Sequence, residues 1–365
     1  MKIKQNLLDL NYEDLKSFLS EKIGIEEKKL NMRTQQIFTA TYQKGLNDFE
    51  KLTTIPINLR EKLSKNISFN DSKIVETQES SDGTLKFLVE LSDGNKVECV
   101  YIPEKTRGTV CVSSQVGCSL TCTFCRSGTQ RLVKNLSTSE IISQVILVKD
   151  KLKDWGDQKI VSNIVFMGQG EPLINMKNLK TAIQILKDKK GLNYGNKKIT
   201  VSTSGIANKI QEAANEIGTY LALSLHAPND KLREEIMPIN KKFKIKDLIQ
   251  ELKYYTSVVK EPIFLEYVML KGVNDTEECA KQLVKLMAQF PSKVNLIEFN
   301  SWPGVKFKPS DRKDIEKFSR YIRDKGYMSF IRRSRGNDVL AACGQLKTES
   351  LKKEQNIKRE QNEIM

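Results

Sequence analysis

Three thiols lie within eight residues of the chain, in the segment Cys118-Ser-Leu-Thr-Cys122-Thr-Phe-Cys125. Three thiolates can bind three irons of a 4Fe-4S cube and leave the fourth iron open, whereas electron-transfer clusters are held by four thiolates. An open iron can bind a ligand that is not protein, so this spacing predicts a catalytic cluster. The alternatives are a four-thiolate zinc site completed by Cys111 or a chance group of buried cysteines.

A glycine next to a carboxylate, and a lone histidine, could form the rest of a binding site. Gly170 permits close backbone approach, and Glu171 can accept a hydrogen bond from an ammonium group. The alternative for this pair is an ordinary loop turn. His226 is the single histidine of the chain, which excludes two-histidine zinc sites. It is not expected to act as a base, and a capped histidine packed at a strand end is the other interpretation.

Length and composition indicate a folded protein of two or three domains, or a barrel with an appendage. The chain has 365 residues, is 39% hydrophobic and carries a formal net charge of +15. No apolar run approaches the ~18 residues of a spanning helix, and the amino-terminal sequence lacks the pattern of a secretory signal. We therefore expect a cytoplasmic protein without a membrane partner. Seven cysteines in a reducing compartment are more typical of metal or redox sites than of structural disulfides.

Alternating β and helical segments must position these side chains. Short β-rich runs predict six strands at 109–113, 163–167, 198–202, 220–225, 263–270 and 294–299. Helices are expected from the capping-box sequence at Ser137 and over 179–187, 206–217, 245–255, 277–289 and 311–325. Repeated βα units predict a parallel α/β sheet, open or closed into a barrel, with function at the carboxyl ends of the strands. A hairpin with a turn at Asp93-Gly94 should precede it.

Basic residues are concentrated in one region near the carboxyl terminus. Residues 306–335 contain eleven Lys and Arg against four Asp and Glu, and the region ends with Ile331-Arg-Arg-Ser-Arg335. Such a surface suits backbone phosphates and would bind nucleic acid in a salt-sensitive way. The alternative is a solvated helix face.

Several segments in order along the chain carry a family resemblance. CxxxCxxC at the start of a βα barrel resembles radical S-adenosylmethionine enzymes. The further segments resemble the adenine-C2 RNA methyltransferases of the RlmN family: Cys111-Val-Ser-Ser-Gln-Val-Gly-Cys118, Met167-Gly-Gln-Gly-Glu-Pro-Leu173, Ser202-Thr-Ser-Gly205, Ser224-Leu-His-Ala-Pro-Asn-Asp230, Leu265-Glu-Tyr-Val-Met-Leu270 and Arg335-Gly-Asn-Asp-Val-Leu-Ala-Ala-Cys-Gly-Gln-Leu346. Gln169, at a position often filled by methionine in this family, and Arg126-Ser-Gly128 after the third cysteine depart from its pattern.

The resemblance implies a partial (β/α)6 barrel with a small amino-terminal helical domain, and a domain order along the chain. Residues 1–70 would be a helical accessory domain that binds RNA, 71–105 a β-hairpin linker, 106–345 the radical S-adenosylmethionine core and 346–365 a polar tail. The implied cofactors are one 4Fe-4S cluster held by Cys118, Cys122 and Cys125, and S-adenosylmethionine, whose cleavage yields a 5′-deoxyadenosyl radical. The implied contacts of S-adenosylmethionine are Gly170, Glu171, Ser202, Ser224, Leu225, His226 and Asn300.

The same resemblance implies roles for two distant thiols and one carboxylate. Cys343 would be methylated first and then carry the carbon onto carbon 2 of adenine in 23S rRNA and tRNA. Cys111 would attack the Cys343 sulfur, form a disulfide and release the RNA, which requires the two Cα atoms to approach within about 7 Å. Glu98 would accept a proton, although the strand pattern around it is also typical of a solvated charge. An electron donor such as flavodoxin, a thiol reductant and a monomeric state are further expectations.

Two rival functions remain open from the sequence. A Cfr-like enzyme that methylates carbon 8 of adenine would use the same two cysteines. A non-catalytic RNA-binding protein with a structural metal site would also explain the basic region. A methylthiotransferase is disfavoured, because Cys99, Cys279 and the remaining thiols do not form a second compact triad.

Overall fold

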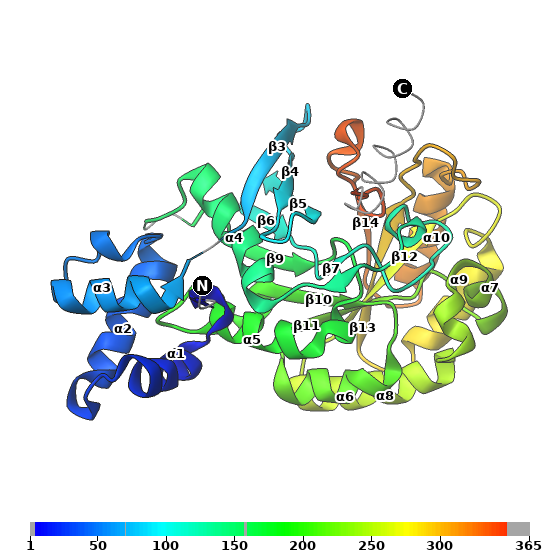
Figure 1. Ribbon diagram of the computed structural model, residues 1–365. Coiled ribbons are helices and arrows are strands. Elements are labelled where there is room, and N and C mark those ends of the chain that lie inside the picture. Colours follow the sequence, from blue (N-terminus) through cyan, green and yellow to red (C-terminus); the bar gives the residue numbers. More distant parts are fainter. Residues whose placement is uncertain (1–3, 70, 157–158, 349–365) are drawn as a thin grey trace, which may run out of the picture.

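The main body of the protein is a partial barrel built on a ten-stranded sheet (Figure 1). The computed structural model describes residues 4–69, 71–156 and 159–348. Of the predicted polar tail, 346–365, the part after Thr348 lies outside the described residues. The sheet order is β14-β13-β12-β11-β10-β9-β6-β5-β4-β3. The strands are β3 (Lys73–Glu79), β4 (Leu85–Glu90), β5 (Lys96–Glu104), β6 (Arg107–Cys111), β9 (Asn163–Phe166), β10 (Ile199–Thr203), β11 (Tyr220–Ser224), β12 (Ile263–Met269), β13 (Ser292–Glu298) and β14 (Ser329–Arg332).

Strands β6 and β9 to β14 run parallel, and β3, β4 and β5 extend the sheet as an antiparallel meander next to β6. Because the carboxyl ends of parallel strands meet at one end of the barrel, the loops that follow them gather there. Two short strands, β7 (Gln115–Val116) and β8 (Lys134–Asn135), pair on either side of the cysteine-rich loop and hold its two ends together.

Helices cover the outer face of the barrel strands, and α6 and α8 lie along its lower side in Figure 1. They are α4 (Thr138–Leu152), α5 (Met176–Lys187), α6 (Ala207–Glu216), α7 (Asp230–Ile236), α8 (Ile245–Val259), α9 (Glu277–Met287) and α10 (Arg312–Asp324). Helix α4 begins with the predicted capping box, in which the Ser137 hydroxyl accepts from the Glu140 amide and the Glu140 carboxylate accepts from the Ser137 amide. Among the described residues, no helix combines the length and apolar character needed to cross a bilayer.

The amino-terminal helices form a separate lobe beside the barrel, at the left of Figure 1. The lobe contains α1 (Tyr12–Phe18), α2 (Glu27–Lys44), α3 (Ile57–Asn66) and a short parallel pair, β1 (Gln5–Asn6) with β2 (Ile67–Ser68). The Asp9 carboxylate accepts from the amide of Ser139 at the start of α4, and Asn11 donates to Gln184 of α5. The lobe is therefore anchored to the helices that follow β6 and β9.

The sheet contains two strands that the sequence analysis did not assign. The sequence predicts six parallel strands, but β14 adds a seventh at one edge of the sheet, and β3 adds a third strand to the predicted hairpin. Both are edge strands with little burial: Phe330 in β14 is 49% exposed, and most residues of β3 are exposed. A strand that buries only part of one face has a weak hydrophobic pattern in its sequence. The segment of β14 was therefore interpreted only as part of the basic region 306–335.

Candidate active site

One cavity at the carboxyl ends of the strands brings the candidate residues together. It has a volume of about 530 Å³, which lies within the range of cofactor and ligand sites. Of the residues singled out from the sequence, it is lined by Cys111, Cys118, Cys122, Cys125, Gly170, Glu171, Ser202, Ser224, His226, Asn300 and Cys343. Glu98 and Leu225 do not line it.

The cysteine-rich loop places three thiols on one wall of this cavity. Cys118, Cys122 and Cys125 follow β7 and are all reduced and partly exposed. The Cys118 amide donates to the Gln130 carbonyl and closes the base of the loop, and the Cys125 amide donates to the Cys122 carbonyl in a turn within it. Burial raises the pKa of each thiol, and the charges of neighbouring cysteines raise those of Cys118 and Cys122 further. A bound metal would reverse this by taking each sulfur as a thiolate.

Within the described part of the chain, no three His, Cys, Asp or Glu side chains converge on the position of one metal ion. A structural zinc ion needs four ligands at a single point, whereas an iron-sulfur cube binds its thiolates through separate irons.

Glu171, the residue after Gly170, is a buried carboxylate that lines the cavity. Only 2% of its surface is exposed, and its Oε2 accepts from the Ser204 amide at 2.7 Å. Burial raises the pKa of Glu171, and hydrogen bonds from Ser204, Thr203 and Leu173 oppose that shift. Among the described residues it has no ion-pair partner, so this carboxylate can accept a cationic group from a ligand.

The preceding residue, Gly170, allows the chain to turn toward the cavity. Its φ is +99°, and a Cβ atom there would lie 2.5 Å from the Cβ of Gln115 and 2.8 Å from the Gln115 amide nitrogen. The Gln115 side chain in turn accepts from the Glu171 amide at 3.0 Å. Only glycine fits this position without displacing the β7 backbone.

We expect Gly170→Ala to lower both stability and cofactor binding. The backbone conformation alone should cost about 1 to 3 kcal/mol in an L-residue, and contact with the Gln115 backbone adds to that cost. Thermal unfolding measures the first effect, and titration with S-adenosylmethionine measures the second. Gly195→Ala is the matched control, because a Cβ at Gly195 meets no atom within 4 Å. An unchanged melting temperature in Gly170→Ala would contradict the close approach of these segments.

His226 is a neutral hydrogen-bond donor toward the cavity rather than a base. Its Nδ1 accepts from the Val268 amide at 3.0 Å, which leaves the proton on Nε2. Burial, together with the smaller effect of the positive charge of Arg233, lowers its pKa to about 3. The ring packs edge-on against Phe124 of the cysteine loop, with the centroids 4.7 Å apart. His226 is therefore both packed at a strand end and part of the cavity wall.

Arg233, which the sequence analysis did not select, fixes the strand ends around this histidine. Its side chain is fully buried on α7. It donates to the carbonyls of Ser204, Ser224 and Leu225 at 2.7, 3.2 and 3.2 Å. A buried guanidinium with these acceptors ties the ends of β10 and β11 together. Nothing in the sequence indicated this buried role, because an arginine in an amphipathic helix is usually exposed.

The side chain of Leu225 points away from the cavity. Leu225 is 2% exposed and packs in the hydrophobic core, where it lines a small apolar pocket with Leu248 and Leu252. Its side chain cannot contact a ligand in the main cavity, so the expected role of Leu225 is limited to its backbone. Periodicity did not resolve this, because the residue lies at the turn where β11 ends.

The two distant cysteines share the same cavity. Cys111 is buried at the end of β6 and packs in a cluster with Val100, Ala341 and Leu346, while Cys343 is exposed toward the cavity. Enclosure by the walls raises the pKa of Cys343 to about 11 although its surface is accessible, and Arg332 opposes that shift. Burial, together with the smaller effect of the charge of Cys343, raises the pKa of Cys111 to about 12. The fold thus brings residues 111 and 343 into one site.

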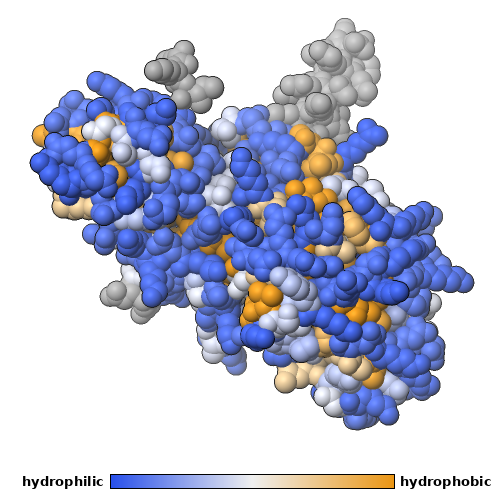
Figure 2. Space-filling view, turned by 90° about the horizontal axis from the view of Figure 1, so that it is seen from below, coloured by the Kyte–Doolittle hydropathy of each residue, from blue (hydrophilic) through white to orange (hydrophobic). Residues whose placement is uncertain are grey.

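Arginines of the predicted basic region form one rim of the cavity. Arg332, Arg333 and Arg335 line it together with Arg107 from β6. The Arg332 guanidinium lies 3.4 Å from the Glu266 carboxylate and is 42% exposed, so it remains accessible to a ligand. The expectation of a cationic surface beside Cys343 is therefore met by side chains on β14 and the loop after it. Seen from below, the molecule is hydrophilic over most of its surface, with apolar side chains in separate patches (Figure 2).

Comparison with known proteins assigns this site to a family. The chain is 46% identical to the dual-specificity RNA methyltransferase RlmN of Parvibaculum lavamentivorans over 90% of this chain and 86% of that protein. The chain belongs to the RlmN family. The RlmN of Agrobacterium fabrum is also 46% identical, over 95% of this chain and 89% of that protein. A crystal structure of a radical SAM methyltransferase from Sphaerobacter thermophilus has a TM-score of 0.88 at 35% identity and covers 94% of this chain.

Two family models match separate parts of the chain. The radical SAM superfamily model matches residues 112–284, and the model of the ribosomal RNA large subunit methyltransferase N-terminal domain matches residues 5–68. The protein is thus an enzyme that uses S-adenosylmethionine, and its family implies an iron-sulfur cluster. The residues present fit these groups, because three thiols, a close-approach glycine and a buried carboxylate that has no ion-pair partner in the described part of the chain line one cavity of suitable size.

Proposed function

We propose that this enzyme methylates carbon 2 of adenine in 23S rRNA and in tRNA, with Cys343 as the carrier of the methyl carbon. The observation that carries the proposal is the meeting of Cys111 and Cys343 in one cavity with the three thiols of the cysteine-rich loop. Carbon 2 lies between two ring nitrogens and is electron-poor, so it cannot displace a methyl group from a sulfonium directly. A thiol carrier and radical chemistry overcome that obstacle.

In this proposal Cys118, Cys122 and Cys125 hold the cluster, and Glu171, Gly170, Ser202, Ser224, His226 and Asn300 surround S-adenosylmethionine. When bound, the two cofactors supply a methyl group and the one-electron chemistry that activates a carbon–hydrogen bond. Glu171 accepts hydrogen bonds from the ligand ammonium, and His226 donates through Nε2. The hydroxyls of Ser202 and Ser224 lie 3.5 Å apart and can bind the same polar edge of the ligand.

The two cysteines then carry out complementary steps. The Cys343 thiolate accepts the methyl group and becomes S-methylcysteine. Loss of one hydrogen atom from that methyl group, for which the bound cofactors would supply the one-electron chemistry, allows its carbon to bond to carbon 2 of adenine. The ring then gives up one electron, which the cluster would accept, and one proton. Glu98 accepts the proton released from carbon 2. The Cys111 thiolate attacks the Cys343 sulfur and breaks its bond to carbon, and the released carbon takes up a proton to become the methyl group, which leaves a disulfide and methylated RNA. An external thiol reduces that disulfide, and an electron donor such as flavodoxin reduces the cluster. Both reductants suit a cytoplasmic enzyme, and we propose that this one acts as a monomer.

The arginines at the cavity rim support an RNA substrate. Arg107, Arg332, Arg333 and Arg335 can contact backbone phosphates around a base that enters the cavity. The base must be unstacked to reach Cys343, which favours loops over regular helices. In this proposal the amino-terminal lobe also contacts the RNA.

The decisive experiment follows the label from S-adenosylmethionine to the base. Reduced, reconstituted enzyme is incubated with precursor 23S RNA or tRNA and with methyl-deuterated S-adenosylmethionine, and the digested nucleosides are analysed by mass spectrometry. We expect label on 2-methyladenosine. Label on 8-methyladenosine would instead support the Cfr-like reaction, and no label with no cleavage of S-adenosylmethionine would support a non-catalytic protein.

A further inference from the structure

The five residues after Cys343, residues 344–348, form a clasp that crosses the carboxyl end of the barrel. The Gln345 side chain donates to the Ser301 carbonyl at 2.8 Å, beyond the end of β13. Asn300, the residue before Ser301, donates to the carbonyl of Cys343 at 3.3 Å. The loop that carries the Cys343 thiol is therefore tied to the end of β13 on one side.

The other side of the clasp is tied to the cysteine-rich loop. The Arg126 amide donates to the carbonyl of Gly344 at 2.7 Å, and the Ser127 hydroxyl donates to the carbonyl of Leu346 at 2.5 Å. Arg126 and Ser127 directly follow Cys125, so the backbone next to Cys343 is bonded to the backbone next to that thiol. Movement of the clasp would change the distance between the two thiols.

Gln169 fastens the far end of the clasp. Its side chain is fully buried and its Nε2 donates to Gln130 Oε1 at 3.0 Å and to Thr348 Oγ1 at 2.8 Å. Its Oε1 accepts from the Glu98 amide at 2.9 Å. One side-chain amide thus joins the cysteine-rich loop, strand β5 and the clasp. The methionine often found at this position in the family could fill the space but could not donate these hydrogen bonds.

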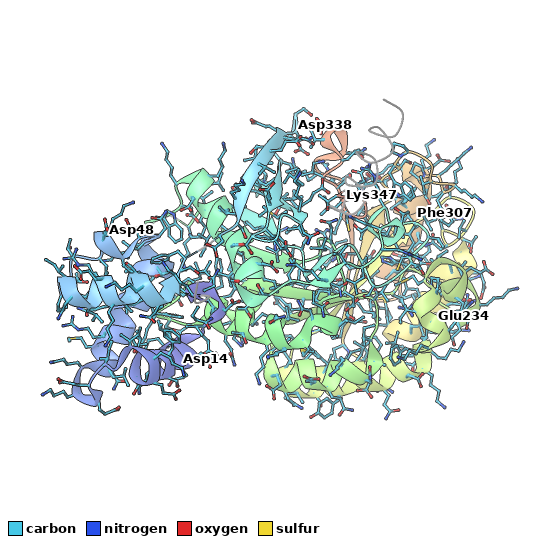
Figure 3. The ribbon with its side chains drawn as sticks, viewed as in Figure 1. Asp14, Asp48, Glu234, Phe307, Asp338 and Lys347 are labelled. Carbon is cyan, nitrogen blue, oxygen red and sulfur yellow. The ribbon has the colours of Figure 1, made fainter. Side chains whose placement is uncertain are left out.

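The closed clasp also occupies Glu98. The Lys347 amide donates to Glu98 Oε2 at 2.7 Å, and the Lys86 ammonium lies 3.4 Å from Oε1. Figure 3 shows Lys347 at the upper end of the barrel, between the β3–β5 meander and Phe307. Glu98 shares a face of β5 with Val100, which lines the cavity, but Glu98 itself does not. The alternative interpretation of Glu98 as a solvated charge is wrong, since Glu98 is only 7% exposed.

We propose that Gln169 and Thr348 are positioning residues that hold the clasp closed while Cys343 accepts its methyl group, and that the clasp leaves Glu98 when RNA is bound. This inference rests on the proposed function. In the closed state the thiol faces the cavity and the proton acceptor is covered, which suits methylation of Cys343. In the open state the Lys347 amide no longer occupies the carboxylate, which suits proton removal from the adenine ring.

The first test separates the loading of Cys343 from the other reactions. Reconstituted wild type, Gln169→Met and Thr348→Val are incubated with S-adenosylmethionine without RNA, and the Cys343 peptide is analysed for S-methylation by mass spectrometry. We expect Thr348→Val to load about tenfold more slowly, the effect of one lost buried hydrogen bond, and Gln169→Met to load at least as slowly, because it also loses the bonds to Gln130 and the Glu98 amide. Reductive cleavage of S-adenosylmethionine, measured in parallel, should fall less than loading, whereas a general loss of structure would lower both together.

The double variant and a matched control sharpen this test. Gln169→Met with Thr348→Val removes both partners of one bond, so its loading should be no slower than that of the worse single variant. Thr34→Val makes the same change at a buried hydroxyl of α2, which donates to the Leu30 carbonyl far from the site, and should load at the wild-type rate. Equal loading in Thr348→Val, Gln169→Met and Thr34→Val would overturn the positioning role. A wild type that never acquires the methyl group would instead contradict the proposed function.

The opening step has its own measurement. Hydrogen–deuterium exchange of the wild-type peptide that contains residues 344–348 should be slow in the free enzyme and at least several-fold faster after addition of tRNA. The peptide that contains Thr34 serves as the internal reference. Faster exchange confined to the clasp supports release from Glu98, and equal protection with and without RNA overturns it.

Discussion

Replacement of Cys343 by alanine should abolish RNA methylation and prevent any covalent bond between enzyme and RNA. No other thiol can replace it, because Cys111 is buried in an apolar cluster and the three thiols of the cysteine-rich loop are the expected ligands of the cluster. The alanine variant should still bind iron and cleave S-adenosylmethionine on reduction, since Cys343 contributes to neither. Transfer of labelled methyl groups to RNA and formation of 5′-deoxyadenosine are measured on the same preparation.

Cys279→Ala is the matched control for this substitution. Cys279 is also a free thiol, but it is buried in α9 and lies outside the cavity. We expect its loss to leave RNA methylation within a factor of a few of wild type, with at most a modest decrease in stability. RNA methylation by Cys343→Ala at a comparable rate would eliminate the thiol carrier and return the assignment to direct transfer.

The sequence was sufficient for most elements that carry the site, because local patterns there agree with the tertiary structure. The capping box at Ser137, the turn at Asp93-Gly94 and the six strands with their helices all recur in the structure. Strand β14 was not predicted, because its residues Ser329–Arg332 form an edge with one exposed face. Yet β14 supplies Arg332, so the same omission concealed an arginine of the cavity wall.

The candidate site was predictable where spacing alone defines the chemistry, and less so where packing decides it. The spacing of three thiols in eight residues is enough to predict a cluster site. In contrast, residues 111 and 343 could be paired only through the family resemblance. Whether Leu225 or Glu98 faces the cavity depends on neighbouring segments that no local pattern encodes. The bonds of Gln169 to Gln130 and Thr348 join parts of the chain up to 179 residues apart, so the departure at Gln169 acquired a meaning only in the structure.

Replacement of Cys111 by alanine should give the opposite phenotype to loss of Cys343: the enzyme should react once with RNA and remain attached to it. Cys343 keeps its place at the cavity, so it can still be methylated and can still bond to the base. Without Cys111 there is no neighbouring thiol to attack the Cys343 sulfur, and the sulfur–carbon bond to RNA persists. A denaturing gel should show a slower band that contains both RNA and protein.

The identity of that band can be established by removing each partner in turn. Nuclease treatment should return the band to the position of free protein, and the remaining nucleotide should be found on Cys343 by mass spectrometry. The double variant Cys111→Ala with Cys343→Ala should form no such band, which excludes attachment through another residue. A single variant that turns over repeatedly would show that release does not depend on Cys111. Attachment at a residue other than Cys343 would show that the carbon is carried elsewhere, so this experiment tests both thiols through the bond that joins them to the substrate.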